Sequence, residues 1–195
     1  MTKQGEKKES QLTIATREHF IKRMAEGNPI HNWFPYHVEQ VQKWALKILD
    51  YYPNVDREIV LLAVWLHDIG QENKENFATH EIFSEEETRK FLGSNGVDQE
   101  KIDKVAHCVR THRCKKDAMP ETDEAKIVAA ADSASHITDI VYIHMLNDGN
   151  SKKSVLDKLE RDIRDIQLLP KPIQEQLIPL QNAWKELINV FPVDN

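Results

Sequence analysis

The sequence predicts an all-α protein, a single domain formed by a bundle of about eight helices. Two observations support this fold class. Apolar residues recur with helical spacing along most of the chain, and we find neither convincing strand alternation nor an internal repeat. A chain of 195 residues, of which 40% are hydrophobic, is long enough to form one domain with a sizeable core.

Glycine, proline and capping residues divide the chain into helices. One helix is expected between Pro53 and Gly70, with Asn54 or Asp56 as its N-cap. The polar stretch 71–79 that follows is expected to be a loop. The last helices are amphipathic, and the segment before them is predicted as one long helix. The other segments with helical periodicity cover about 10–26, 35–51, 80–92, 98–112, 123–148, 152–168 and 172–190.

Composition and charge exclude several classes of protein. A formal net charge of −6 gives no sign of the basic face that general nucleic-acid binding requires. The two cysteines, Cys108 and Cys114, do not form a disulfide framework or a metal-type pair. The polar N-terminus lacks the apolar core of a signal peptide, and no apolar run is long enough to span a bilayer. We therefore expect a cytoplasmic protein without a membrane partner, with a disordered tail at 1–9 and one domain over 10–195.

The helix that ends at Gly70 carries the first sign of a functional site. It contains no polar residue from Ile59 to Leu66 and then runs directly into His67 and Asp68. A helix that is apolar on all sides is normally buried, and an ionised aspartate there is costly without a counter-charge. A divalent cation binds neutral imidazole and carboxylate together. Adjacent helical residues point about 100° apart, so both can reach one ion only where the helix ends.

Further metal ligands must come from other helices. His37 is expected in the middle of the 35–51 helix, close to its apolar stripe. Asp132 follows the small residues 129–131, which let helices approach closely. Taken singly, a buried histidine is more often satisfied by a backbone carbonyl, and such an aspartate more often caps or hydrogen-bonds. Together they predict four ligands from three helices: His37, His67, Asp68 and Asp132.

This pattern resembles the HD-domain superfamily of metal-dependent phosphohydrolases. The likeness covers roughly residues 30–140 and rests on the motifs PYHVEQV, WLHDIG and VAAADSA, which contain the four predicted ligands. Members of this family with a two-metal centre carry two additional histidines, which match His80 in THEIFSEEE and His112 in VRTHRCKK. The resemblance implies that Asp68 bridges two ions. The rival interpretation is that His80 and His112 contact only the substrate phosphate.

The implied activity is hydrolysis of a phosphoester of a small phosphorylated metabolite or nucleotide by a metal-activated water, which Asp68 orients. The implied cofactor is one or two divalent transition-metal ions, drawn from Mn, Fe, Co, Ni and Zn. Gln71 stands where the nucleotidases and alarmone hydrolases of the family have a glutamate, which argues against those branches. The Gly-Tyr-Pro signature of the cyclic dinucleotide phosphodiesterases is absent as well.

A basic cluster flanks His112 in a chain that is otherwise acidic. Solvation of such a cluster is the usual explanation, but beside a metal site it also suits binding of an anion. We therefore predict substrate contacts from three of its members: Arg110, Arg113 and Lys115. His136 shares a helix face with Asp132 and could either reach the pocket or hydrogen-bond a ligand.

Two alternatives from other classes remain open. One is an oxygenase of the same fold that holds two iron ions with the same ligand types and acts on a small polar substrate. The other is a non-catalytic regulatory module that binds a metal or a ligand. In that case the C-terminal helices would serve a partner rather than pack on the domain's own core. The sequence also leaves a homo-oligomer open.

Overall fold

The computed structural model describes residues 9–192, and it contains nine α-helices and two short 3₁₀ helices within that range. No β-strand occurs in the described part of the chain, so the all-α prediction is confirmed. The predicted tail lies outside these residues, apart from Glu9, which forms an ion pair with Arg17. The helices are α1 (Gln11–Glu26), α2 (Phe34–Leu49), α3 (Arg57–Leu66), η1 (Ile69–Glu72), η2 (Lys74–Thr79), α4 (His80–Ser94), α5 (Gln99–Thr111), α6 (Asp123–Thr138), α7 (Val141–Asn147), α8 (Lys152–Ile166) and α9 (Lys171–Val190).

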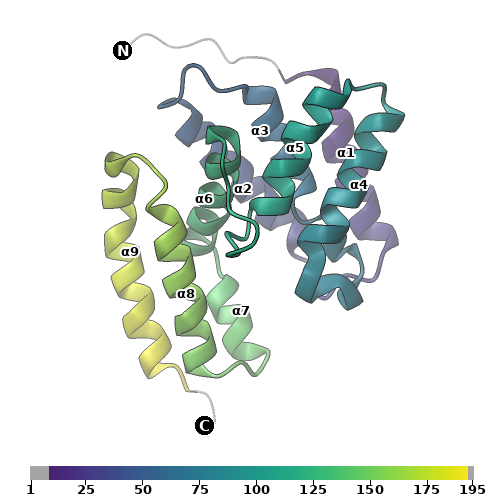
Figure 1. The fold of residues 1–195 in the computed structure, drawn as a ribbon. Coiled ribbons are helices and arrows are strands. Elements are labelled where there is room, and N and C mark those ends of the chain that lie inside the picture. The colour runs from purple at the N-terminus through teal and green to yellow at the C-terminus, as the bar shows by residue number, and fades with distance from the viewer. Residues whose placement is uncertain (1–8, 193–195) are drawn as a thin grey trace.

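Helix α3 lies at the centre of the N-terminal part of the fold, where α1, α2, α4, α5 and α6 all pack against it (Figure 1). Asp56 caps its N-terminus by accepting hydrogen bonds from the backbone N–H groups of Glu58 and Ile59. Every residue from Ile59 to Leu66 is buried, as the uninterrupted apolar sequence predicts. The surrounding helices therefore enclose the end of α3, where the His-Asp pair lies.

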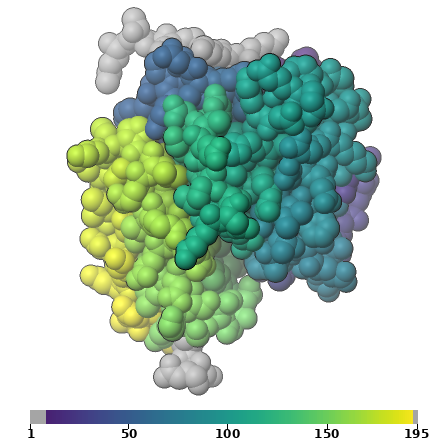
Figure 2. Space-filling view, viewed as in Figure 1, coloured from purple at the N-terminus to yellow at the C-terminus, as the bar shows by residue number. Residues whose placement is uncertain are grey.

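Helices α8 and α9 pack against each other and against α6 (Figure 1). The apolar side chains of α8 belong to the same hydrophobic core as α3, so α8 extends the domain rather than standing apart from it. Figure 2 shows the connection between α5 and α6 lying on the surface between α8 and the α4–α5 pair. None of the described helices is long and apolar enough to cross a membrane.

The predicted long helix over 123–148 is wrong, because Asp139 divides it into α6 and α7. The backbone of Asp139 is extended (φ −108°, ψ −160°), and its N–H donates to the carbonyl of Ser135. Its Oδ1 atom accepts from the N–H of Val141 at 2.8 Å and so begins the next helix. A short polar side chain that hydrogen-bonds the neighbouring backbone competes with the helix in this way.

Two smaller expectations also need correction. The segment 71–79, expected to be a loop, contains the end of η1 and all of η2. His37 lies in the first turn of α2, which begins at Phe34, and not in the middle of the helix. The place of His37 within the helix matters, because the N-terminal end of α2 is the end that faces the C-terminus of α3.

Candidate metal centre

His67 is the C-cap of α3, and its ring orientation is determined locally. Its Nδ1 atom donates a hydrogen bond of 2.7 Å to the carbonyl of Val64. Its Nε2 atom has no hydrogen-bond partner among the described residues, although the side chain is 0% exposed. The nearest carboxylate oxygens are those of Asp68 at 3.5 Å and Asp132 at 3.7 Å. A buried nitrogen without a partner costs free energy unless something binds it.

His80 and His112 repeat this geometry at two other helix ends. Their Nδ1 atoms donate to the carbonyls of Phe77 and Val109, at 2.9 Å and 2.7 Å. Their Nε2 atoms lie 3.2 Å apart, so two neutral rings would present their lone pairs to each other. Two nitrogen ligands at right angles on one ion, each at about 2.1 Å, would be about 3 Å apart. This pair of histidines therefore fits a metal ion, and this arrangement is repulsive without a cation or proton.

Asp68 lies between the two sets of histidines. Its Oδ1 atom is 3.0 Å from Nε2 of His80 and 3.7 Å from Nε2 of His112. Its Oδ2 atom is 3.5 Å from Nε2 of His67 and 3.8 Å from Nε2 of His37. One carboxylate thus faces a different pair of imidazoles with each oxygen, which is the orientation of a ligand that bridges two ions.

Gly70 allows α4 to approach the end of α3 closely. A Cβ atom at this position would lie 2.5 Å from the carbonyl oxygen of His80, which is backbone and cannot easily move. The N–H of Gly70 also donates to the hydroxyl of Ser84 on α4 at 2.9 Å. The absence of a side chain therefore determines how near His80 comes to Asp68.

His37 and Asp132 complete the other side of the centre. Nε2 of His37 lies 3.1 Å from Oδ1 of Asp132, and the two side chains come from the packed helices α2 and α6. Nδ1 of His37 lies 3.3 Å from the hydroxyl of Ser135 and 3.5 Å from Oδ2 of Asp139. A carboxylate behind a histidine ligand typically fixes its tautomer and raises its basicity. Asp139, which the sequence did not single out, has that position here.

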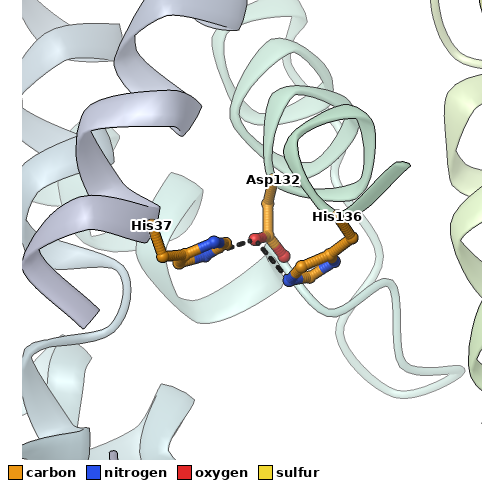
Figure 3. Close-up of side chains that lie close together, drawn as sticks. All are labelled: His37, Asp132 and His136. Atoms are coloured by element: carbon orange, nitrogen blue, oxygen red, sulfur yellow. Dashed lines mark ion pairs between the residues drawn. The ribbon is translucent and has the colours of Figure 1, made fainter. Parts of the chain in front are cut away.

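Figure 3 shows His37 and His136 on either side of Asp132. Nε2 of His136 is 3.5 Å from Oδ1 of Asp132, and its ring is parallel to that of His37 with centroids 4.9 Å apart. Nδ1 of His136 lies 2.8 Å from the ammonium group of Lys158. An ammonium group has no acceptor, so Nδ1 accepts from Lys158 and Nε2–H is directed toward Asp132. This geometry favours the hydrogen-bonding role that the sequence left open for His136.

The pKa values of His37 and Asp68 show that positive charge is stabilised at the candidate metal centre. Burial lowers the pKa of His37, but Asp132, Asp139 and Asp68 outweigh burial and raise it to about 10. Burial tends to raise the pKa of Asp68, yet His67 and His80 hold it well below its ordinary value. Asp68 and Asp132 therefore stay ionised, and their negative charge favours either protonated histidines or a metal ion at this place.

The pKa of His112 moves in the opposite direction. Burial, helped by the nearby rings of His67 and His80, lowers it to about 3. His112 is therefore neutral at ordinary pH, with its free lone pair directed toward His80. A neutral imidazole in that orientation is ready to bind a metal without losing a proton.

The three side chains of the predicted basic cluster converge on one buried carboxylate, that of Glu81, which is 1% exposed. Arg113 donates to Glu81 at 2.8 Å, Arg110 does so at 3.4 Å, and Lys115 forms an ion pair with the same carboxylate. Arg113 lines the cavity described below, whereas Arg110 and Lys115 are not among its lining residues. Substrate contact stays a prediction for all three residues. The position of Arg113 on the cavity wall supports it, whereas Arg110 and Lys115 contact Glu81 away from the cavity.

The six predicted ligands surround one end of a cavity of about 570 Å³, with His67 directly behind the lining side chains. Three groups of their donor atoms lie close enough to hold an ion: His37 with Asp132 and His136, His37 with His67 and Asp68, and Asp68 with His80 and His112. Sequence reasoning missed other residues of the wall. They include His31, Trp33, Gln71, His144, Lys158 and Arg161.

The sequence contained a sign that α8 contributes polar side chains to the cavity wall. Asp162 falls within the apolar stripe that contains Leu159 and Ile166, and a carboxylate in such a stripe needs partners. No comparable pattern marks His31 and His144. In the structure their rings stack with that of Trp33, at centroid distances of 5.0 Å and 5.4 Å.

Comparisons with known proteins agree with the site. The family model for the HD domain matches residues 35–136, and the chain belongs to this family, whose domains bind divalent metals. The match begins just before His37 and ends at His136, so it includes the three groups of side chains within residues 9–192 that could hold an ion.

Two individual proteins extend the comparison. The crystal structure of a predicted HD superfamily hydrolase from an uncultured Thermotogales bacterium is similar over 91% of this chain and 90% of that one, with a TM-score of 0.62 and 16% identity. That likeness shows the fold. A tRNA (cytidine(56)-2'-O)-methyltransferase of Picrophilus torridus is 31% identical over 156 residues, which are 72% of this chain. The chain spans 40% of the length of that relative, whose name does not fit the site described above.

Proposed function

We propose that the protein is a metal-dependent phosphohydrolase that cleaves a phosphoester of a small phosphorylated metabolite or nucleotide. The observation that carries this proposal is the position of Asp68, whose two oxygens face different pairs of histidines. A carboxylate in that position suits a centre with two ions, and such centres activate water against phosphorus. Membership of the HD family, which is typically hydrolytic, supports the same reaction class.

The donor set fits two divalent transition-metal ions. The first would be held by His37, His67, Asp132 and Oδ2 of Asp68, and the second by His80, His112 and Oδ1 of Asp68. When bound, the ions would polarise the phosphoryl oxygens and lower the pKa of a water. Imidazole and carboxylate ligands suit Mn, Fe, Co, Ni and Zn.

The chain's own residues prepare the site for this reaction. The carbonyls of Val64, Phe77 and Val109 hold three imidazoles in the tautomer that leaves Nε2 free. Asp68 would orient the attacking water, and the Nε2–H of His136 is directed toward Asp132 and would help to hold that carboxylate in place. The cavity is large enough for a small organic phosphate, and the side chains of Asp68, His80 and His112 at its reacting end are buried.

The test begins with elemental analysis of the purified protein. We expect two metal equivalents per chain, or two after reconstitution of the chelated protein. A panel of phosphomonoesters and phosphodiesters is then assayed for phosphate release, with the chelated protein as the matched control and oxygen uptake recorded in parallel. Metal-dependent release from at least one ester supports the proposal. Two iron equivalents with oxygen uptake and no phosphate release would replace it with an oxygenase.

A further inference from the structure

Two basic residues of α8 lie on the wall of the metal-site cavity, outside the region that the family model matches. They are Lys158 and Arg161, three residues apart and therefore on neighbouring positions of one helix face. Helix α8 packs on α6 and α7, so these side chains approach the cavity from the side of His37 and Asp132. Arg113 approaches from the other side, at the end of α5.

A buried network fixes the ammonium group of Lys158. It donates to Oδ1 of Asp162 at 2.5 Å and to Nδ1 of His136 at 2.8 Å. Asp162 is 2% exposed, and its other oxygen accepts from the hydroxyl of Tyr142 at 2.7 Å. An ammonium group has three donors, so one N–H of Lys158 remains for a ligand in the cavity.

The charge balance of the cavity leaves Arg161 without a partner. Arg113 is paired with Glu81, and Lys158 is paired with Asp162. Within residues 9–192 the guanidinium of Arg161 forms no ion pair with a carboxylate, whereas its neighbours on α8, Lys158 and Arg164, pair with Asp162 and Asp165. Two divalent ions with the carboxylates of Asp68 and Asp132 carry a formal charge of about +2, which one phosphomonoester dianion would balance. Two other carboxylates line the cavity: Asp165 pairs with Arg164, and Asp148 lies 3.9 Å from Nε2 of His31. Neither pairs with Arg161, which is exposed at the cavity wall, so its guanidinium is available to an anionic ligand.

We propose that Arg161 and Lys158 bind a second anionic group of the substrate, separate from the phosphoryl group at the metal centre. This inference depends on the proposed phosphohydrolase function and narrows its substrate class to small organic phosphates that carry a carboxylate or a second phosphoryl group. Guanidinium groups bind both kinds of oxyanion through paired hydrogen bonds. A single imidazole, that of His136, separates Lys158 from Asp132, so only a few bonds separate the two anionic groups.

Binding of phosphonates tests the subsite without turnover, because a phosphatase does not cleave their P–C bond. Propylphosphonate has one anionic group, phosphonopropionate has a carboxylate in place of the terminal methyl group, and propylene bisphosphonate has a second phosphoryl group. Each is titrated anaerobically into the metal-loaded protein by calorimetry. The variants are Arg161→Ala and Lys158→Met, and the control is Lys153→Ala on the same helix, whose side chain is exposed and pairs with Asp157.

We expect at least one of the doubly anionic ligands to bind about tenfold more tightly than propylphosphonate, as a charge-assisted hydrogen bond implies. Arg161→Ala should remove that advantage while the affinity for propylphosphonate stays unchanged, and Lys153→Ala should keep it. The preferred ligand distinguishes a carboxylate from a phosphoryl group. Equal affinities in the unaltered protein, or an equal loss for all three ligands in Arg161→Ala, would overturn the inference.

The outcomes for the subsite and for the proposed function are separable. Phosphate release from simple esters with no advantage for doubly anionic ligands would leave the phosphohydrolase standing and remove the subsite. An advantage that depends on Arg161, with no phosphate release from any ester, would keep the subsite and remove the phosphohydrolase. Lys158→Met serves as the second variant, and its metal content shows whether the network around Asp162 also supports the centre.

Discussion

The two halves of the candidate metal centre are built in different ways. In the α4–α5 half, formed by His80, His112 and Oδ1 of Asp68, each imidazole lies at a helix end and is held by the carbonyl three residues before it. In the α2–α6 half, formed by His37, His67, Asp132 and Oδ2 of Asp68, the carbonyl of Val64 holds His67 in the same way, but His37 is supported by Ser135 and Asp139 from another segment. Local backbone geometry orients both imidazoles of the first half, whereas the second half also depends on packing between α2 and α6.

This difference also appears in the charges. His112 is neutral because burial and neighbouring imidazoles lower its pKa to about 3, whereas the carboxylates around His37 raise its pKa to about 10. A metal ion that binds His112 would therefore find the imidazole already neutral, whereas a metal ion that binds His37 would have to displace a proton. The halves should consequently differ in their response to mutation and to pH.

The largest effect is expected from Asp68→Ala, which removes the one ligand that both halves share. Both ions should be lost, and kcat/KM for the best ester should fall by more than about a hundredfold, beyond the range typical of outer-sphere changes. Metal analysis and phosphate release measure this, and circular dichroism should show an intact helical fold. A variant with full metal content and turnover would contradict the bridging role.

The next largest effect separates the halves. His112→Ala should remove one metal equivalent and leave the other, because the α2–α6 half keeps its own ligands. His107→Ala is the matched control, since His107 lies on the same helix and accepts a hydrogen bond from the N–H of Glu121 at 3.2 Å, outside the centre. Loss of both ions in His112→Ala would show that the halves are not independent.

The pH dependence of metal binding sharpens the comparison further. His37 is protonated at pH 7.5 in the metal-free chain, because its pKa is about 10. Filling the α2–α6 half should release this proton, and the affinity should rise by up to about tenfold per pH unit until the pH passes that pKa. His112, with a pKa of about 3, contributes no proton. Calorimetry in buffers of different ionisation enthalpy measures the release. A chain with His37→Gln should release fewer protons but not none, because Asp68 and Asp132 outweigh burial and raise the pKa of His67 as well.

The smallest effect is expected from Asp139→Asn, which keeps the cap of α7 but removes the negative charge behind His37. Metal affinity should fall by about tenfold for the α2–α6 half alone. Metal competition with a chromogenic chelator measures the two affinities separately. An equal loss in both halves would mean that Asp139 supports the packing of α6 and α7 rather than one imidazole.

The sequence by itself determined the helical class, the burial of α3 and the six side chains that meet at the centre. Helical periodicity and caps are local properties, so Asp56 caps α3 as its position predicts, and Asp98 and Thr122 cap the helices that begin where the ranges 98–112 and 123–148 were expected to begin. The candidate ligands could be proposed from the sequence because a charged pair that ends an apolar helix needs a partner, and because their order resembles that of a known family.

Only the tertiary structure decided which charges remain available to a ligand. The basic cluster beside His112 was visible in the sequence, but the buried carboxylate of Glu81 holds all three of its side chains in ion pairs. Arg161, which no motif marks, lies on the cavity wall without a partner among residues 9–192. Ion pairing and hydrogen bonding between distant segments depend on how helices pack, and residue spacing along one helix carries no information about the groups that another helix brings to it.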